Sequence, residues 1–295
     1  MKTQLQLSEE FAASTARLRA DIVGDTPREH LLDDVSFLNY RLADVRLEPA
    51  VTLPEPDISW EQDGDLSISY DGAHMHLTGP WPAGPVQKVV VALLALRMEV
   101  RGLHPFHASA VRYQGKTVVF LGGESNHGKS MGQIEACRRG ARLISTETTV
   151  IDDGGWAVLG SKQPFIKKRT TGTERADKAA PEQGVRKFFG DMPSWELHPE
   201  PSDVDLVIVP AIDGNFAPSI APMIPFERQF QTFHSVQNYL LLNELLHPGI
   251  AMPVVDTAVL RTARAEFVAR FCRRPYYFAR AATPQALLDL VDTVM

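Results

Sequence analysis

The 295-residue sequence has few cysteines, no long hydrophobic run and no excess of positive charge. Its two cysteines, Cys137 and Cys272, lie far apart and have no C-x-x-C spacing, so we expect neither a disulfide framework nor a zinc site. Lysine and arginine number 30 against 36 aspartates and glutamates, which gives a formal net charge of −6. Because phosphate backbones favour clustered positive charge, this balance argues against a general nucleic-acid-binding surface.

Membrane insertion and secretion are also not expected. The most hydrophobic run, residues 89–96, is bounded by Lys88 and Arg97 and is far shorter than the roughly 20 residues that span a bilayer. The first residues lack the basic start followed by an apolar stretch that is typical of a secretion signal. We therefore expect a cytoplasmic protein without membrane or nucleic-acid partners.

The strongest positive signal is a phosphate-binding loop. Residues 123–130 read Gly-Glu-Ser-Asn-His-Gly-Lys-Ser and match the pattern G-x-x-x-x-G-K-[ST]. The run 116–121 predicts a buried strand before the loop, and residues 131–139 predict a helix after it, ended by Gly140. This strand, loop and helix order is the context that the motif requires, whereas a glycine-rich turn without a ligand is the alternative.

Each residue type in such a loop has a separate role. The glycines let main-chain amides face phosphate oxygens, Lys129 brings positive charge to the β- and γ-phosphates, and Ser130 offers a hydroxyl to Mg²⁺. His127 is expected to be a solvent-facing spacer within the loop. The residues expected to bind ATP are Gly123, Glu124, Ser125, Asn126, His127, Gly128, Lys129, Ser130 and Met131.

The N-terminal third predicts a small α+β region. A helix is expected over residues 8–22, and alternating apolar residues over 58–77 predict an antiparallel meander with hairpin turns at Asp63-Gly64 and Asp71-Gly72. A helix through Val89 to Val100 is expected to end at Gly102. We therefore predict an N-terminal domain over residues 1–102, with a role in binding the acceptor or in oligomerisation, and a second domain over 103–295.

The second domain reads as alternating strands and helices. A hairpin with a turn at Gln114-Gly115 is expected to lead into the phosphate-binding loop. Residues 160–201 are basic and weakly periodic, and loops of this length are usually functional or disordered. The further elements expected are strands over 142–151, 156–159, 204–210 and 275–279, and helices over 225–246, 256–273 and from Thr283-Pro284 to Val294.

Residues 104–160 resemble HPr kinase/phosphorylase and its relatives, which are P-loop kinases with a phosphoenolpyruvate-carboxykinase-like fold. The resemblance rests on His107-Ala-Ser-Ala-Val111, on the strand, loop and helix around residues 123–130, and on Leu143-Ile-Ser-Thr-Glu-Thr-Thr-Val-Ile151. It is weaker over 203–295 and does not extend to residues before 85. The resemblance implies an α/β fold with a mixed sheet flanked by helices, and ATP-dependent phosphorylation of a hydroxyl group.

The resemblance also implies which carboxylates take part. In the relatives the strand after the loop helix commonly ends in Asp-Asp, with one carboxylate on the metal and the other acting as base. Here the matching residues are Thr146 and Glu147, so Glu147 is the candidate for Mg²⁺ ligation together with Ser130 and for proton acceptance. Asp152 or Asp153 could supply a second carboxylate, although aspartate is also favoured in a glycine-rich turn for conformational reasons.

Two further groups of candidates remain. His107 falls near the transferred phosphate in the resemblance and could orient the acceptor or bind the γ-phosphate, or it is a core imidazole bonded to the backbone. Lys167, Lys168 and Arg169 could close over the substrate and exclude water, or they form a solvated charge run.

These residues predict an ATP- and Mg²⁺-dependent kinase that phosphorylates a hydroxyl of a small metabolite or a biosynthetic peptide. One alternative is a nucleotide-binding sensor or scaffold without transfer, which the threonine at position 146 favours. Another is an NTPase. Against it, Asp205 opens the later apolar strand and Pro210 follows Val209, so a Walker-B signature is not recognised. Formation of a homo-oligomer is left open.

Overall fold

The structure is a computed structural model that describes residues 5–25, 28–32, 38–42, 45–49, 53–122, 127–162, 195–241 and 244–295. By its internal contacts the chain forms two compact units, one made of residues 1–102 and 239–261, the other of 103–238 and 262–295. The units are therefore not two consecutive stretches of chain. Both contain strands and helices, and none of the helices in the described ranges is long and apolar enough to cross a membrane.

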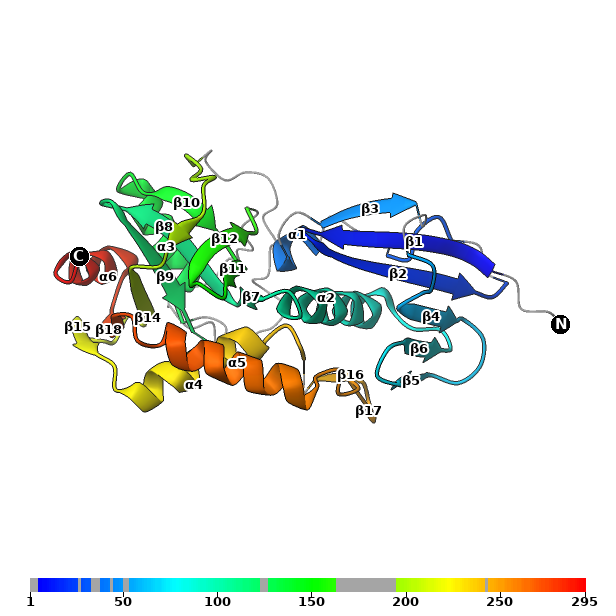
Figure 1. The fold of residues 1–295 in the computed structure, drawn as a ribbon. Coiled ribbons are helices and arrows are strands. Elements are labelled where there is room, and N and C mark those ends of the chain that lie inside the picture. The colour runs from blue at the N-terminus through cyan, green and yellow to red at the C-terminus, as the bar shows by residue number, and fades with distance from the viewer. Residues whose placement is uncertain are drawn as a thin grey trace. The chain divides into compact units, whose positions relative to one another are not determined.

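The first unit is built on a six-stranded sheet with the order β3-β1-β2-β4-β6-β5 (Figure 1). Helix α2 (Ala83–Glu99) packs against β2 and buries apolar side chains along most of its length. The other elements of this unit are β1 (Leu5–Ala13), β2 (Ala16–Val23), α1 (Leu38–Arg41), β3 (Val45–Pro49), β4 (Ile58–Glu61), β5 (Ser67–Tyr70), β6 (Met75–Thr78), β16 (Leu245–His247) and β17 (Ile250–Ala251).

The predicted helix over residues 8–22 is wrong, because this segment forms the antiparallel pair β1–β2. The two strands meet at a turn in which Ser14 has a φ of 55°. In β2 the buried positions recur at every second residue, which is strand periodicity. In β1 the two adjacent glutamates suggest a solvent-exposed helix face, but both carboxylates are buried. Glu9 accepts a hydrogen bond from the main-chain amide of Leu31 at 2.7 Å, and Glu10 accepts one from the amide of Leu53 at 2.8 Å.

The predicted meander is correct for one of its two turns. Strands β5 and β6 form an antiparallel hairpin around Asp71-Gly72. Strand β4, however, lies parallel to both β2 and β6, so the turn at Asp63-Gly64 does not close a hairpin. Trp60 in β4 is fully buried, and its indole nitrogen donates to the main-chain oxygen of Gly79, 2.9 Å away, just beyond the end of β6. This bond joins the ends of the two parallel strands.

The second unit contains a mixed six-stranded sheet with the order β10-β8-β9-β14-β18-β15. Its three central strands, β9, β14 and β18, are parallel, and the outer pairs are antiparallel. The strands are β8 (Ala108–Tyr113), β9 (Lys116–Leu121), β10 (Arg142–Ser145), β14 (Leu206–Ile212), β15 (Ser219–Pro222) and β18 (Tyr276–Ala281). This arrangement confirms a mixed sheet, and the hairpin β8–β9 confirms the predicted turn at Gln114-Gly115.

Helices cover both faces of this sheet (Figure 1). Val119 and Leu121 of β9 pack with Phe267 and Phe271 on one face, whereas Phe120 packs on the other. The helices are α3 (Lys129–Arg138) and α6 (Pro284–Asp292) on the face of Phe120, and α4 (Pro225–Gln237) and α5 (Ala258–Phe271) on the opposite face. The structure confirms three predicted helices, the one after the loop, the one over 256–273 and the one at the C-terminus. The helix predicted over 225–246 is shorter than expected, because α4 ends at Gln237.

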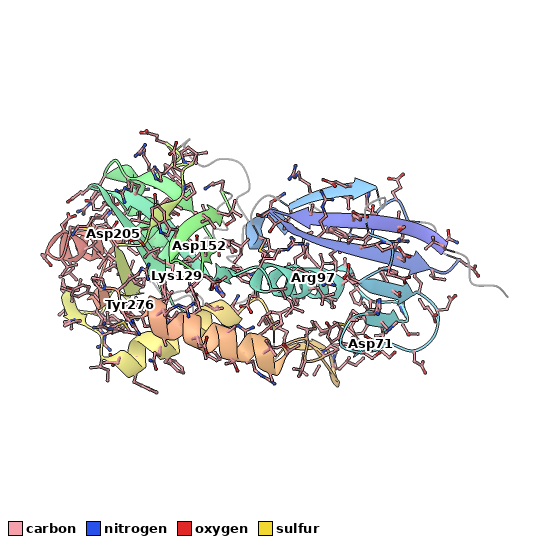
Figure 2. All side chains as sticks on the ribbon, viewed as in Figure 1. Asp71, Arg97, Lys129, Asp152, Asp205 and Tyr276 are labelled. Atoms are coloured by element: carbon pink, nitrogen blue, oxygen red, sulfur yellow. The ribbon has the colours of Figure 1, made fainter. Side chains whose placement is uncertain are left out.

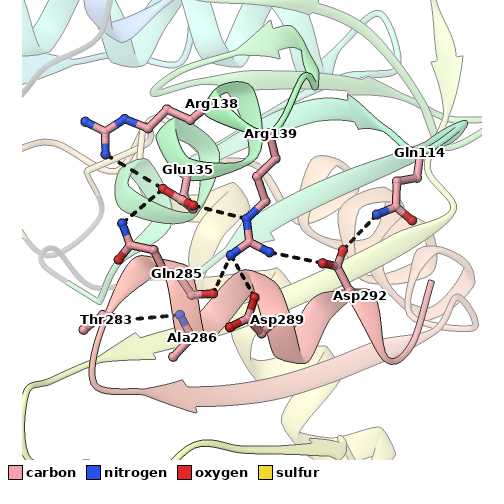
Figure 3. A network of polar contacts seen from close by, with 9 residues as sticks. All are labelled: Gln114, Glu135, Arg138, Arg139, Thr283, Gln285, Ala286, Asp289 and Asp292. Atoms are coloured by element: carbon pink, nitrogen blue, oxygen red, sulfur yellow. Dashed lines mark hydrogen bonds and ion pairs between the residues drawn. The ribbon is translucent and has the colours of Figure 1, made fainter.

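The two helices on the Phe120 face are joined by one arginine (Figure 3). The guanidinium of Arg139, at the end of α3, donates to Glu135 of its own helix at 3.1 Å. It also reaches Asp289 at 2.9 Å and Asp292 at 3.1 Å, both on α6. At the start of α6, the Thr283 hydroxyl oxygen accepts from the amide of Ala286 at 3.2 Å, as the predicted N-cap requires.

A second, antiparallel sheet has the order β13-β12-β11-β7. Its strands are β7 (Leu103–Phe106), β11 (Thr149–Asp152), β12 (Trp156–Gly160) and β13 (Ser202–Asp203). The predicted single strand over 142–151 is therefore wrong, because β10 and β11 belong to different sheets. Residues 146–148 turn the chain from one sheet to the other, and this turn carries the candidate Glu147.

Candidate active site

The candidate site lies at the carboxyl end of β9, where the phosphate-binding motif follows the strand. Residues 123–126, which supply Gly123, Glu124, Ser125 and Asn126, lie outside the described residues. The amide of Ile212, at the carboxyl end of the neighbouring parallel strand β14, donates to the main-chain oxygen of His127, 3.2 Å away. The carboxyl ends of parallel strands are where open α/β sheets bind ligands.

Gly128 directly precedes helix α3 as its N-cap, in a conformation that favours glycine. Its φ is 107°, in the left-handed region. A side-chain carbon added at this position would lie 2.7 Å from Cγ1 of Ile212, so both the backbone and the available space require glycine. The main-chain N–H groups at the N-terminus of α3 favour the binding of an anion at this point.

Lys129, labelled in Figure 2, is the first residue of α3. Its side chain is buried, with 8% exposure. Its Nζ donates to the main-chain oxygen of Gly122, 2.8 Å away, at the end of β9. Burial lowers the pKa of the Lys129 amine to about 8, and the nearby Glu147 carboxylate limits this decrease. A positive charge is thus held in a place where solvation is poor and an anionic partner would stabilise it.

Glu147 lies in the turn between β10 and β11. Its carboxylate acts to raise the pKa of the Lys129 amine, against the larger decrease caused by burial. The neighbouring Thr146 is buried, and its hydroxyl is 3.0 Å from the Ser161 hydroxyl. The carboxylate that the sequence singled out thus has an electrostatic effect on the lysine of the loop motif.

Ser130 and Met131 follow in the first turn of α3, and both are partly exposed. The described residues contain no group of three or more His, Cys, Asp or Glu side chains that could hold a metal ion. Mg²⁺ beside a nucleotide usually takes only one or two protein ligands, with phosphates and waters supplying the rest. A serine hydroxyl and a carboxylate are oxygen ligands of the type Mg²⁺ prefers, so Ser130 and Glu147 fit this ion by their chemistry.

His107 lies between β7 and β8 and is buried, with 8% exposure. Its main-chain amide donates to the oxygen of Ser235 at 3.2 Å, and the Ser235 hydroxyl donates to the main-chain oxygen of His107 at 3.2 Å. These bonds tie the residue to α4. His107 stays a candidate, because they involve its main chain and not its ring.

Asp152 and Asp153 lie at the end of β11 that is farther from Glu147. Asp152, labelled in Figure 2, accepts a hydrogen bond from the amide of Trp156 at 2.9 Å, which is a turn-forming role. Asp153 contacts His104 Nε2 at 3.1 Å. A strand advances about 3.3 Å per residue, so Asp152 lies roughly 10 Å along β11 from Thr149, the residue that follows the turn carrying Glu147. The other candidates, Lys167, Lys168 and Arg169, lie outside the described residues.

One acidic residue near the loop was missed by the sequence analysis. Strand β14 continues through Pro210 to Ile212, so Asp213 directly follows an apolar strand that lies parallel to β9. Its carboxylate accepts from the amide of Asn215 at 3.1 Å, which is also a turn-forming contact. A proline usually marks the end of a strand, and reading across it would have revealed this position.

With the geometry in place, the chain can be compared with proteins of known family. Neither models of protein families nor curated proteins match this chain.

Proposed function

We propose that this chain is an ATP- and Mg²⁺-dependent phosphotransferase that acts on a hydroxyl group. The observation that carries the proposal is the buried Lys129, which is the first residue of the helix that follows a parallel strand and whose pKa the Glu147 carboxylate acts to raise. The resemblance of residues 104–160 to HPr kinase/phosphorylase, and the phosphoenolpyruvate-carboxykinase-like fold that it implies, support the proposal. The acceptor that we propose is a small metabolite or a biosynthetic peptide.

In this proposal the residues at the start of α3 hold the triphosphate. The Lys129 amine leaves the oxygen of Gly122 and contacts the β- and γ-phosphates, where its charge offsets the charge that spreads over the transferred group. Bound Mg²⁺, held by Ser130 and Glu147, would add further neutralisation of the phosphate oxygens. Phosphoryl transfer depends mainly on such positioning and charge compensation.

Glu147 also has the chemistry of a proton acceptor. The acceptor oxygen forms a bond to the γ-phosphorus, the bond from that phosphorus to the β-phosphate oxygen breaks, and ADP leaves. The proton of the acceptor hydroxyl passes to the Glu147 carboxylate directly or through one water. Asp152 is less suited to this role than the sequence suggested, because its carboxylate is bonded to the amide of Trp156.

The proposal is tested by measuring ADP release with Mg²⁺-ATP and a panel of hydroxyl-bearing metabolites and peptides. Stimulation by an acceptor, together with a phosphorylated product in mass spectra, would support it. Lys129→Ala should abolish turnover, and Glu147→Gln should retain ATP binding by calorimetry while losing about 100-fold or more in rate. Lys116→Ala, at the opposite end of β9, is the matched control and should keep full activity.

A second candidate, an NTPase, is favoured by Asp213. An acidic residue after the strand beside the loop strand is the usual metal-holding position of P-loop NTPases. Release of ADP and phosphate without any acceptor, lost in Asp213→Asn, would favour hydrolysis over transfer. Binding of ATP without either kind of turnover would instead favour the nucleotide sensor, for which Thr146 in place of a carboxylate is the supporting observation.

A further inference from the structure

The turn that carries Glu147 is held by the end of strand β12. Ser161 is buried, with 1% exposure, and its hydroxyl oxygen accepts from the amides of Glu147 and Thr148, each at 3.1 Å. The same hydroxyl lies 3.0 Å from Oγ1 of Thr146. One serine side chain therefore contacts all three residues of the turn.

Main-chain bonds join the same partners. The amide of Thr146 donates to the oxygen of Ser161 at 2.9 Å, and the amide of Ser161 donates to the oxygen of Thr148 at 3.0 Å. A turn that receives both side-chain and main-chain bonds from one residue has little freedom to change its conformation. The direction in which Glu147 leaves the backbone is thus fixed by Ser161.

The residues on either side of Ser161 also contact the segment that contains the turn. A side-chain carbon added at Gly160 would lie 2.2 Å from Cβ of Ser145 and 2.8 Å from the main-chain oxygen of Thr148, so only glycine permits this close approach. On the other side, the amine of Lys162 donates to the main-chain oxygen of Ile144. Residues 160–162 therefore contact every residue from 144 to 148.

We propose that Ser161 is a positioning residue that fixes the turn from which the Glu147 side chain extends. The proposal rests on the proposed function in one respect, because the activity affected is that of the same site. The physical claim itself does not need a substrate. Without the Ser161 hydroxyl, the amides of Glu147 and Thr148 lose a shared acceptor, the turn relaxes, and the position of the Glu147 carboxylate is no longer fixed.

The test uses the charge of Lys129 as its readout, in the full-length protein without nucleotide. The pH dependence of acetylation of Lys129 by acetic anhydride, followed by mass spectrometry, gives the midpoint at which its amine loses a proton. Glu147→Gln serves as the reference, because removal of the carboxylate should lower this midpoint. Ser161→Ala should lower it in the same direction, by a few tenths to about one pH unit.

Several variants control for general loosening of the fold. Ser161→Thr keeps the hydroxyl and should restore the midpoint, and Ser161→Cys, a weak acceptor of similar size, replaces the alanine variant if that one does not fold. Ser202→Ala removes another buried serine of the second unit, whose hydroxyl is 2.7 Å from His198 Nε2, and should leave the midpoint unchanged.

An unchanged Lys129 midpoint in both Ser161→Ala and Ser161→Cys would overturn the proposal, as would an equal shift in Ser202→Ala. Failure of the proposed function gives a different pattern, in which the midpoint moves as expected but no variant shows nucleotide turnover. If the kinase assay succeeds, Ser161→Ala should lower kcat about 10-fold or more and change the KM for ATP by less than about 3-fold.

Discussion

The amine of Lys129 donates a hydrogen bond to the main-chain oxygen of Gly122, the first residue after β9. In this state the lysine satisfies one donor but remains buried, with its pKa lowered to about 8 by desolvation. A buried ammonium group destabilises the folded state relative to the unfolded chain, where water solvates it. Residues that lower stability in this manner are characteristic of functional sites.

Replacement of this lysine by a neutral side chain should therefore stabilise the protein. A decrease from 10.5 to about 8 corresponds to roughly 3 kcal/mol, and the lost hydrogen bond offsets about 1 kcal/mol of that gain. We expect Lys129→Met to raise the free energy of unfolding at pH 7 by about 1–3 kcal/mol, measured by urea denaturation. Lys116→Met, a lysine at the start of β9, is the control and should change it by less than about 0.5 kcal/mol.

The sign of the pH dependence provides an internal check on this prediction. Below about pH 8 the lysine is charged in both states, so the full cost of burying the charge is present. Between about pH 8 and 10.5 the unfolded chain binds more protons than the folded one, so the free energy of unfolding of wild type increases with pH. The difference in stability between the variant and wild type should therefore become smaller as pH rises. A Lys129→Met variant that is less stable than wild type at pH 7 would contradict the prediction.

The elements that flank the phosphate-binding motif could be predicted because their signals are local. The strand 116–121, the turn at Gln114-Gly115 and the helix after the loop each depend on residues adjacent in sequence, and all are present in the structure. The expectation that Glu147 lies near Lys129 came from the resemblance alone. Sequence spacing could not give it, because it depends on the chain passing from one sheet to another through residues 146–148.

The failures have the same physical origin. The helix predicted over residues 8–22 was wrong because two glutamates that look solvent-facing are buried against main-chain amides contributed by distant residues. Asp213 was missed because Pro210 was taken as the end of a strand that tertiary pairing extends. The role proposed for Ser161 had no sequence signal, because the hydrogen bonds behind it join the residue that follows β12 to a turn more than ten residues earlier.

Arg139 provides a test of how α3 is held in place. The side chain is one-quarter exposed and contacts Glu135, Asp289 and Asp292 (Figure 3). Its removal leaves the largely buried carboxylate of Glu135 without this partner, so Arg139→Ala should lower the free energy of unfolding by about 1–3 kcal/mol.

The adjacent Arg138 offers a matched control for this variant. It reaches the same Glu135 at 3.8 Å, but its side chain is 66% exposed. Arg138→Ala should change the free energy of unfolding by less than about 0.5 kcal/mol, because exposed ion pairs contribute little. Equal losses in the two variants, measured by urea denaturation under identical conditions, would show that the contacts to α6 do not stabilise the fold.

His104 makes the stability of the second unit depend on pH. Its ring stacks on Phe267 with a centroid distance of 3.7 Å, and burial lowers its pKa, an effect that Asp153 opposes and that Arg264 and Arg270 reinforce. Because the folded state resists protonation, the unfolded chain binds more protons as pH falls through about 6.5, the usual value for histidine. Stability should therefore fall in this direction.

The variant His104→Phe keeps an aromatic ring against Phe267 and removes the titrating group. Wild type should lose more free energy of unfolding than this variant when pH is lowered from 7.5 to 5. His198 also has a pKa lowered by burial, so His198→Gln tests whether the effect belongs to His104 in particular. The same loss between the two pH values in wild type and in His104→Phe would mean that the ring of His104 accepts a proton in the folded state as readily as in the unfolded chain.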